Sequence, residues 1–288
     1  MSQSSDHGTS HGASQGASHG ADAPTAVIGA GVMGEALLAG LLAAGHRPEQ
    51  LLVGEKRTER AAELRERHGV RVVPNAEAAS GAGTILLVVK PADVGAVLEE
   101  ISPHLGAGQL LVSLAAGITI GYVEERVPDG VAVARVMPNT PALVGEGMLV
   151  LSPGSHCDDA RADEAEALLA PMGRVVRVPE KQQDAVTAIS GSGPAYVFLV
   201  AESLIESGVH LGLPRDVATE LAVQTLSGAS RMLRETGEHP TRLREGVTSP
   251  GGTTAAALRQ LEEHGLRTAF LSATEAARDR SRALARGE

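Results

Sequence analysis

The sequence is poor in several kinds of residue, and each shortage excludes a class of protein. It has one cysteine, Cys157, so no disulfide can form within the chain, which fits a reducing compartment. It has 25 basic residues against 35 acidic ones, and the formal net charge of −10 argues against a general nucleic-acid binder. No uninterrupted apolar run reaches the roughly 18 residues that suggest a membrane span. We therefore expect a cytoplasmic protein that binds neither nucleic acid nor membrane.

Aromatic residues are also scarce. Tyr122, Tyr196, Phe198 and Phe270 are the only ones in 288 residues, and there is no Trp. This composition disfavours a site that stacks nucleobases. The core must be built from Ala, Val, Leu and Ile, and helices rich in Ala and Gly can approach one another closely.

The first 23 residues are rich in Gly, Ser, Ala and His and contain no hydrophobic segment. They match neither a secretory signal nor a core-forming stretch, so we expect a disordered tail at 1–23. His7, His11 and His19 could chelate a metal, but the composition favours a disordered tail, and we expect no metal site.

Residues 24–179 alternate between short apolar strands and helical segments. The most continuous apolar run, 84–90, is typical of a strand buried on both faces, and Pro91 can begin the helix after it. Strands separated by helices predict parallel pairing through crossover connections. We expect an α/β protein whose N-terminal domain is a Rossmann-type doubly wound parallel sheet.

The strand signal stops after Pro179, and 180–288 is expected to be an all-α domain. GSGP, at 191–194, is expected to interrupt a helix. The next helix has an apolar stripe at helical spacing, and the one from Pro214 to about Glu235 has its own expected inner positions. The stripe comprises Val197, Val200, Ala201, Leu204 and Ile205, and the inner positions of the following helix are Val217, Leu221, Gly228 and Met232. Several helices are apolar on more than one face, so we expect them to pack against a second copy of the chain; the alternative is that they cover the first domain.

The first strand is followed by G-A-G-V-M-G, with Gly29, Gly31 and Gly34 at the spacing of a dinucleotide-binding turn. Such a motif alone is weak evidence, but here a strand precedes it and a helix follows it. Gly29 permits the tight turn, Gly31 lets the backbone approach a pyrophosphate, and Gly34 allows close helix packing. The N–H groups at the helix N-terminus then face the phosphates.

The end of the second predicted strand gives mixed signals about the cofactor. Glu55 lies where an acidic residue would bind a ribose 2′-hydroxyl, as in NADH binding. Lys56 and Arg57 follow at once and could bind the 2′-phosphate of NADPH. An exposed charged strand end is the alternative. We expect NADPH, with NADH possible.

Several segments together resemble the pyrroline-5-carboxylate reductases. The motifs are GAGVMGEALLAGL (29–41), VVKP (88–91), VSLAAGITI (112–120), RVMPNTPALVGEGM (135–148), AISGSGPAY (188–196) and VTSPGGTT (247–254). The resemblance implies a Rossmann domain followed by a helical dimerisation domain, with dimers often assembled into larger rings. It also implies reduction of the cyclic imine (S)-1-pyrroline-5-carboxylate to L-proline with NAD(P)H, the last step of proline biosynthesis.

The substrate of such an enzyme is a small ring with one carboxylate and one C=N bond, and the cofactor supplies the hydride. The protein need only position the ring and hydrogen-bond to it, so no catalytic His or Glu is required. Backbone N–H groups and hydroxyls at a helix N-terminus can hold a carboxylate. The predicted substrate-binding residues at such a helix start are Ser249, Gly251, Gly252, Thr253 and Thr254.

The resemblance places the hydroxyl of Thr254 near the ring nitrogen, as the predicted catalytic group. The alternative is that Thr253 or Thr254 only caps its helix. The resemblance also implies that Pro138 and Asn139 shape the floor under the ring, although Asn139 could instead tie down its own loop.

The resemblance implies a second set of residues along the cofactor. The pyrophosphate is expected at the glycine turn, the adenosine ribose near Lys56 and Arg57, and the nicotinamide on the small residues that follow the fifth strand. The full predicted set is Gly29, Ala30, Gly31, Val32, Met33, Gly34, Lys56, Arg57, Asn75, Val89, Lys90, Pro91, Ala115, Ala116 and Gly117. Asn75 could instead be a helix N-cap, and Lys90 a purely structural charge.

Two other functions fit part of the sequence. A 3-hydroxyacid dehydrogenase of the 6-phosphogluconate type also combines such a glycine turn with a helical domain, but it needs a lysine on a helix of that domain. The last lysine of this chain is Lys181, at the domain edge. A non-catalytic nucleotide sensor would keep the glycine turn but would not need RVMPNTP and SPGGTT together.

Overall fold

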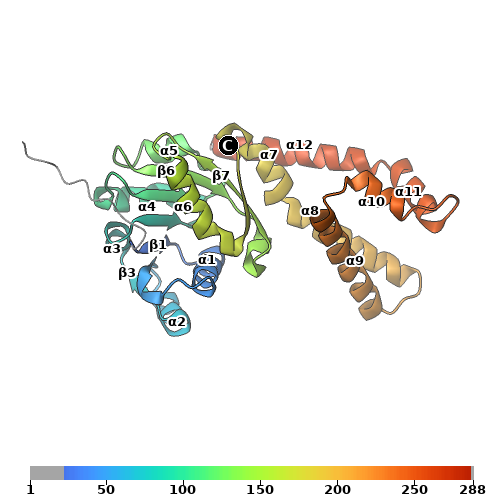
Figure 1. The fold of residues 1–288 in the computed structure, drawn as a ribbon, viewed down its shortest axis with the longest axis horizontal. Coiled ribbons are helices and arrows are strands. Elements are labelled where there is room, and N and C mark those ends of the chain that lie inside the picture. The colour runs from blue at the N-terminus through green and yellow to red at the C-terminus, as the bar shows by residue number, and fades with distance from the viewer. Residues whose placement is uncertain (1–22, 287–288) are drawn as a thin grey trace, which may run out of the picture.

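The computed structural model describes residues 23–286, so the predicted tail lies almost wholly outside the described residues. Figure 1 shows two parts: a sheet flanked by helices, and a group of long helices that extends from one side of it. This arrangement confirms the expected fold class.

All eight predicted strands are present in one sheet. Their order is β3-β2-β1-β4-β5-β6-β7-β8, and the pairs from β3 through β6 are parallel. The strands are β1 Thr25–Ile28, β2 Leu51–Gly54, β3 Arg71–Val73, β4 Thr84–Leu87, β5 Leu110–Ser113, β6 Ala132–Met137, β7 Gly147–Pro153 and β8 Gly173–Arg177. The predicted strand at 84–90 ends earlier, at Leu87.

The expectation of a wholly parallel sheet was wrong at one pair. β7 runs antiparallel to β6, with Met137 opposite Val150, and β8 is parallel to β7. The connection from β6 to β7 is only a short 3-10 turn, Thr140–Val144, which is too short for the helical crossover that parallel strands require.

Helices cover both faces of the sheet and bury two apolar clusters. One cluster joins the sheet to α1, α2 and α6, and the other joins it to α3, α4 and α5. In β4, Leu86 belongs to the first cluster while Ile85 and Leu87 belong to the second, so this strand is buried on both faces as predicted. The helices of this part are α1 Val32–Ala43, α2 Thr58–His68, α3 Asn75–Ser80, α4 Val94–Ile101, α5 Ile120–Glu124 and α6 Asp159–Leu169.

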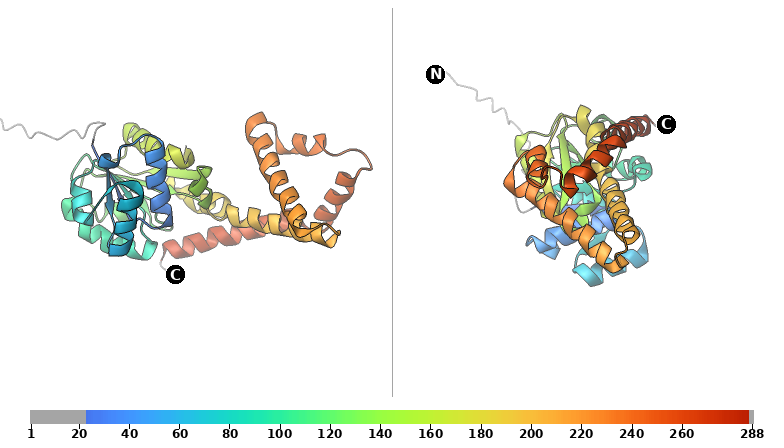
Figure 2. Two further views of the ribbon diagram at one scale, coloured as in Figure 1. Left: turned by 90° about the horizontal axis from the view of Figure 1, so that it is seen from below. Right: turned by 90° about the vertical axis from the view of Figure 1, so that its right-hand side faces the viewer.

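The remaining helices leave the sheet and return to it. In Figures 1 and 2, α7 and α8 lead outward, α9 to α11 lie at the far end, and α12 runs back until its C-terminal end lies beside the sheet domain. α9 packs on α8, and α12 packs on α7 and the π-helical turn Thr187–Gly191. These helices are α7 Gln183–Val186, α8 Gly193–His210, α9 Arg215–Thr236, α10 Pro240–Gly246, α11 Thr253–Glu263 and α12 Leu266–Ala285.

GSGP interrupts the α-helix as predicted: α7 ends at Val186, the π turn Thr187–Gly191 follows, and α8 begins at Gly193. Helical hydrogen bonding nevertheless continues across the break, because the N–H of Ser192 donates to the carbonyl of Thr187. Pro194 lacks an N–H, but it stands in the first turn of α8, where no intrahelical donor is needed.

The predicted inner face of α9 is not buried within one chain. Val217, Leu221 and Met232 are exposed, while Ala218 and Ala222 are buried. The approach to α8 is close: a Cβ added at Gly208 would lie 2.8 Å from the Cβ of Ala218. Small residues therefore fill the contact between the two helices, and the large apolar side chains face outward.

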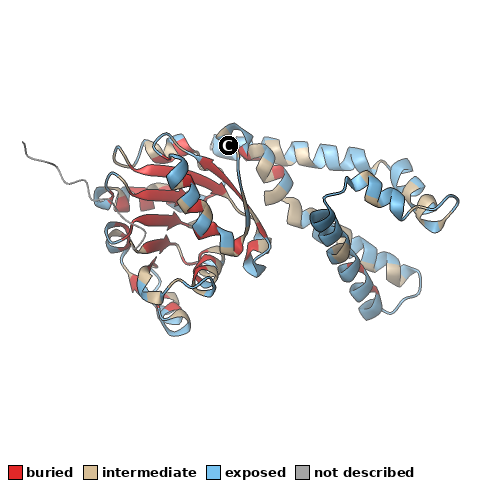
Figure 3. Cartoon of the chain, in the orientation of Figure 1, coloured by how far each residue is buried: buried red, intermediate tan, exposed pale blue. Residues whose placement is uncertain are grey.

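The apolar stripe of α8 is likewise uncovered within one chain. No residue of α8 is buried, and Val197 and Leu204 are both exposed. Of the 22 large apolar residues that are exposed in the described part of the chain, 18 lie beyond residue 180. Figure 3 shows the contrast, with burial concentrated in the sheet domain. The helical part thus lacks a core of its own.

One helical stretch meets the length and composition of a membrane span. Glu180–His210 contains a window of mean hydropathy 1.3, of which 6% is buried. This stretch has no uninterrupted apolar run of the length expected for a membrane span, because Ser, Gly and Glu residues divide it. Its mean hydropathy is nevertheless high enough to meet the criterion.

Candidate cofactor and substrate site

The strand order places a crevice at the carboxyl edge of the sheet. β2 and β3 lie on one side of β1 and β4 to β6 on the other, so the connections reverse direction between β1 and β4. In open parallel sheets, ligands bind at this reversal, beyond the carboxyl ends of the strands. The glycine turn follows β1 at this point.

The three glycines of the turn differ in what surrounds them. Gly29 has φ +95°, and a Cβ there would lie 2.7 Å from Val89 Cγ1. A Cβ on Gly34 would lie 2.1 Å from the carbonyl oxygen of Gly29, so α1 packs directly on the turn. Gly31 has no neighbour within 4 Å of its Cβ position and is exposed. The first and last glycines shape the turn, and the middle one leaves open space in front of the N-terminus of α1.

Lys56 and Asn75 meet at one carboxylate on the far side of the crevice. The Lys56 Nζ lies 2.8 Å from Glu100 Oε2, and the Asn75 amide donates to the same oxygen at 3.0 Å. These contacts lower the pKa of Glu100. Asn75 is buried and is the first residue of α3, whose N-cap is Pro74, so the capping alternative for Asn75 was wrong.

Arg57 is held by the acidic residue at the end of β2. Its Nε and Nη2 each lie 3.0 Å from one oxygen of Glu55, a bidentate pair that lowers the pKa of the carboxyl. The Glu55 side chain is almost buried, whereas Arg57 is exposed. The carboxylate of Glu55 is therefore paired with the cation that follows it in the sequence.

Arg60, on α2, is a residue that sequence reasoning missed. Its Nε donates to the carbonyl of Ala30 in the glycine turn at 3.2 Å, and its guanidinium also pairs with Glu35 and Glu63. Arg57, Arg60 and Gly31 line one cavity of about 470 Å³. The only sequence signal was an Arg one helical turn after Arg57, which is indistinguishable from a solvated helix charge.

Glu35, in the first turn of α1, is the centre of a small charge cluster. Hydrogen bonds from His68, Arg60 and Arg67 lower the pKa of Glu35 from its ordinary 4.5 to about 2, against the opposing effect of burial. The cluster joins α1 to α2 directly behind the glycine turn.

The segments that follow β4 and β5 carry the next residues predicted to bind the cofactor. Val89 lines a cavity of about 320 Å³ with Gly29, Lys56 and Asn75, which brings four predicted cofactor residues together. Lys90 and Pro91 are exposed at the start of a 3-10 turn. Beyond β5, Ala115 is buried and Ala116 is exposed, while Gly117 adopts φ +76°.

Asn139 lies after β6 and uses both halves of its amide within the chain. Its Nδ2 donates to the carbonyl of Ser190 at 3.0 Å, and its Oδ1 accepts from the N–H of Met148 at 2.8 Å. It therefore ties its loop to β7 and to the π turn, as the alternative interpretation proposed. It also lines a cavity of about 410 Å³ with Tyr196 and Phe270. The neighbouring Pro138 is partly buried.

The loop 249–254 forms the N-terminus of α11. Gly251 has φ +67°, a conformation that favours glycine, and a Cβ on Gly252 would lie 2.3 Å from Ser249 Oγ, so a larger residue there would displace the serine hydroxyl. Gly252 is the N-cap, without a capping side chain. The suggestion that Thr253 or Thr254 only caps this helix was therefore wrong. Thr253 is exposed, and Thr254 is partly exposed.

The loop 249–254 is not near the glycine turn of its own chain. Figures 1 and 2 show α11 at the end of the helical part that is remote from the sheet. Within one chain the structure therefore brings the cofactor residues together but leaves the predicted substrate loop apart from them.

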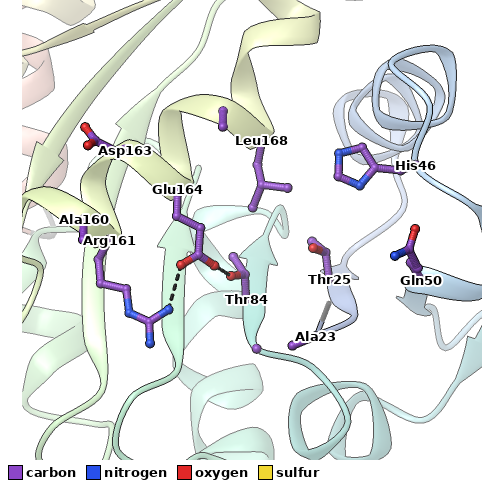
Figure 4. Close-up of a pocket in the computed structure, with 12 residues that line it drawn as sticks. Ala23, Thr25, His46, Gln50, Thr84, Ala160, Arg161, Asp163, Glu164 and Leu168 are labelled. Atoms are coloured by element: carbon purple, nitrogen blue, oxygen red, sulfur yellow. Dashed lines mark hydrogen bonds and ion pairs between the residues drawn. The ribbon is translucent and has the colours of Figure 1, made fainter. Parts of the chain in front are cut away.

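A cavity of about 540 Å³ lies at the opposite edge of the sheet, next to the start of β1 (Figure 4). It is bordered by Ala23, Thr84 and Glu164, and Arg161 pairs with Glu164 while Glu164 also accepts a hydrogen bond from Thr84. Arg161 and Glu164 in this cavity are thus paired with one another. Ligands of parallel sheets bind at the carboxyl ends of the strands, and this cavity is at the amino ends.

The described residues contain no cluster of His, Cys, Asp or Glu that could hold a metal ion. The fold, the glycine turn and the cations beside it define a dinucleotide-binding protein of the Rossmann type with an added helical domain.

Comparison with known proteins identifies the family. Residues 24–117 match the family model "NADP oxidoreductase coenzyme F420-dependent", and residues 180–284 match "Pyrroline-5-carboxylate reductase dimerisation". A pyrroline-5-carboxylate reductase of Corynebacterium melassecola is 49% identical over 263 residues, which cover 90% of this chain and 97% of that protein. The chain belongs to the pyrroline-5-carboxylate reductase family.

Solved structures agree. The pyrroline-5-carboxylate reductase of Coxiella burnetii superposes with a TM-score of 0.88 at 36% identity, covering 91% of this chain and 98% of that one. The Plasmodium falciparum pyrroline carboxylate reductase, solved with NADP bound, gives a TM-score of 0.81 at 33% identity over 92% and 98% of the two chains.

Proposed function

We propose that this protein reduces (S)-1-pyrroline-5-carboxylate to L-proline by hydride transfer from NADPH. Support comes from family membership over nearly the whole described chain and from the cofactor crevice at the carboxyl edge of the sheet. The nicotinamide supplies the hydride when the cofactor is bound. The chain's own residues then have three tasks: to hold the phosphates, to support the nicotinamide ring and to position the imine.

The phosphates belong at the glycine turn and at the cations beside it. The open space at Gly31 and the N-terminus of α1 suit the pyrophosphate. Lys56 and Arg57 suit the ribose 2′-phosphate. Two adjacent cations at this position favour NADPH over NADH. Asn75, Val89, Lys90 and Pro91 complete the proposed cofactor contacts toward the adenosine and the centre of the crevice.

The nicotinamide belongs on Ala115, Ala116 and Gly117, whose small side chains let a flat ring lie on the backbone. Pro138 and Asn139 form the floor on the substrate side. Because Asn139 is bonded to Ser190 and Met148, its role is to fix this floor rather than to donate to the substrate.

The imine belongs in the loop 249–254. The N–H groups at the start of α11 and the hydroxyls of Ser249 and Thr253 hold its carboxylate without a cation. The hydroxyl of Thr254 hydrogen-bonds the ring nitrogen. Gly251 and Gly252 leave room for the ring.

The active site is shared between two copies of the chain. The observation behind this step is that α11 lies at the end of the helical part that is remote from the sheet of its own chain (Figures 1 and 2). A second copy that packs on the exposed apolar helices would bring its loop 249–254 to the first copy's crevice. Helices α8 and α9 contribute the uncovered side chains Val197, Leu204, Val217 and Leu221 to this interface.

A mixed dimer tests the shared site. One chain carries Thr254→Ala and the other carries Gly31→Ala, and each variant alone should have strongly reduced activity. Co-expression creates one site with two intact halves, so activity should recover to a substantial fraction. No recovery in a verified mixed dimer would assign both halves to one chain.

The same reasoning gives the remaining assignments. The boundary between the two domains lies at residue 180, with a dinucleotide-binding domain at 24–179 and a helical domain at 180–288.

The exposed apolar stretch at 180–210 is buried by a second copy and not by a membrane, because Glu202 and Glu206 lie within it on α8. Dimers assemble further into a ring. The single buried Cys157 fits a cytoplasmic protein.

The dehydrogenase alternative is further weakened. Lys181 is exposed in the 3-10 turn Glu180–Gln182 at the domain edge, not on a helix facing the crevice. The deciding assay supplies the imine with NADPH or NADH and follows oxidation of the nicotinamide. Cofactor binding with no oxidation of NADPH by the imine would instead favour a nucleotide sensor.

A further inference from the structure

One carboxylate at the domain junction joins three elements around the proposed nicotinamide loop. Glu180 opens the 3-10 turn that begins the helical part of the chain. Its Oε1 accepts a hydrogen bond from the backbone N–H of Ile120 at 2.7 Å and lies 3.1 Å from Nη1 of Arg135. The contacts bridge 60 and 45 residues of sequence, so only the folded structure brings them together.

The two partners lie on either side of the loop 115–119. Ile120 is the first residue of α5, directly after the loop, and its N–H is one of the donors that a helix leaves unsatisfied at its N-terminus. Arg135 is 5% exposed on β6 and stands opposite Ser113, the last residue of β5 before the loop. At the loop's start, the N–H of Leu114 donates to the carbonyl of Leu87. Glu180 thus fixes the end of the loop that the sheet does not hold.

The helical part contacts the same loop a second time. A Cβ placed on Gly117 would lie 3.9 Å from the Cβ of Leu284 and 3.9 Å from the nitrogen of Ala285, so the end of α12 rests against this glycine. α12 is itself held to α7 by a hydrogen bond of 2.8 Å from the hydroxyl of Ser281, which is buried, to Asp184. The helical part of the same chain therefore contacts this region at two places, Gly117 within the loop and Ile120 directly after it.

We propose that Glu180 is a positioning residue for hydride transfer: through Ile120 and Arg135 it fixes the loop 115–117 on which the nicotinamide lies. This rests on the proposed function, because it takes the nicotinamide to be bound at Ala115–Gly117. The helical domain then has two roles, since it supplies the substrate loop to a partner and sets the nicotinamide floor in its own chain. The adenosine half of the cofactor, bound at the glycine turn and Lys56, is independent of Glu180.

The test compares the whole cofactor with its adenosine half. Dissociation constants of NADPH and of adenosine 2′,5′-bisphosphate are measured by calorimetry for the wild-type protein, Glu180→Ala and Glu180→Gln. Glu125→Ala is the matched control, because Glu125 is an exposed carboxylate at the end of α5 whose recorded ion pair, at 3.4 Å, is with its neighbour Arg126. Thermal unfolding and oligomer size are recorded for each variant.

Glu180→Ala should weaken NADPH binding on the order of tenfold, as expected for loss of a charge-assisted hydrogen bond, while binding of the bisphosphate changes by less than about twofold. Glu180→Gln keeps an acceptor for Ile120 and should fall between, and Glu125→Ala should match wild type. If Glu180→Ala weakens both ligands equally, or neither, Glu180 does not position the loop. These measurements need no turnover, so an inactive wild-type protein would refute the proposed reaction without deciding this point.

Discussion

The glycine turn allows stability and cofactor binding to be separated with two substitutions of the same kind. Gly31→Ala places a methyl group where nothing lies within 4 Å, and the backbone there, at φ −70° and ψ −163°, is accessible to alanine. Gly34→Ala places the same group 2.1 Å from the carbonyl oxygen of Gly29, inside a turn that cannot shift freely. The two variants therefore differ in location but not in chemistry.

The expected magnitudes follow from these surroundings. Gly31 is the N-cap of α1, and replacing glycine by alanine there costs at most about 1 kcal/mol. Overpacking at Gly34 costs about 1–3 kcal/mol or more, which lowers Tm by several degrees at roughly 2–4 °C per kcal/mol. If Gly31→Ala raises the Kd of NADPH by about a hundredfold, the stabilisation by a ligand concentration of 100 times the wild-type Kd falls from about 2.7 to about 0.4 kcal/mol.

The assay is thermal unfolding with and without NADPH, followed by circular dichroism because the chain has no Trp to report its own unfolding. Gly31→Ala should unfold near the wild-type temperature and lose most of the shift that NADPH produces. Gly34→Ala should unfold earlier even without ligand. A Gly31→Ala protein that NADPH stabilises as much as wild type would show that the phosphates do not approach this glycine, and the assignment of the crevice would be wrong.

Three further predictions concern the substrate loop, the cofactor phosphate and pH. Thr254→Ala should lower kcat/KM by roughly 10- to 1,000-fold, the range for one polarising hydrogen bond, and Thr254→Ser should largely restore it. Helicity should not change, because Gly252 is the N-cap of α11. A loss of kcat/KM below about twofold would contradict the proposed hydrogen bond from Thr254 to the ring nitrogen. Replacing Lys56 and Arg57 with Ala together should raise KM for NADPH more than for NADH, and an equal rise for both would show that the pair does not bind the 2′-phosphate. Glu35, with its pKa lowered to about 2, stabilises the fold above its unfolded pKa of about 4.5, and this contribution is lost as pH falls from about 5 toward 2. Glu35→Gln should therefore reduce the urea midpoint clearly at pH 7 and much less at pH 2.5, whereas a constant difference would place the effect outside ionisation.

Local sequence patterns predicted the strands and the turn chemistry well. The eight strands followed from short apolar runs, and the left-handed backbone at Gly29 followed from its place between a strand and a helix. Such features depend on neighbours a few residues away. The antiparallel direction of β7 was missed, although the short connection between Met137 and Gly147 is visible in the sequence and leaves no room for a helical crossover.

Helical faces were harder to assign. On α9 the sequence suggested that Val217 and Leu221 point inward, whereas Ala218 and Ala222 do. Hydrophobicity identifies which residues avoid water, but not which partner removes them from it. In this chain the close contact within one copy uses small residues, and the large residues are left for another surface.

Several site residues depend on long-range contacts. Arg60 reaches the glycine turn across 30 residues, and Asn139 reaches Ser190 across 51. A charged or amide side chain has the same local sequence signature whether it meets such a partner or water, so its role was not predictable.

The sequence by itself determined the order of strands and helices, the glycine turn, and the chemical character of the loop 249–254, because each is written in neighbouring residues. Only the tertiary structure decided that this loop stands apart from the crevice of its own chain and that Glu180 meets Ile120 and Arg135. The physical reason is that distances between remote segments are set by how whole helices pack, and not by the preferences of any one segment.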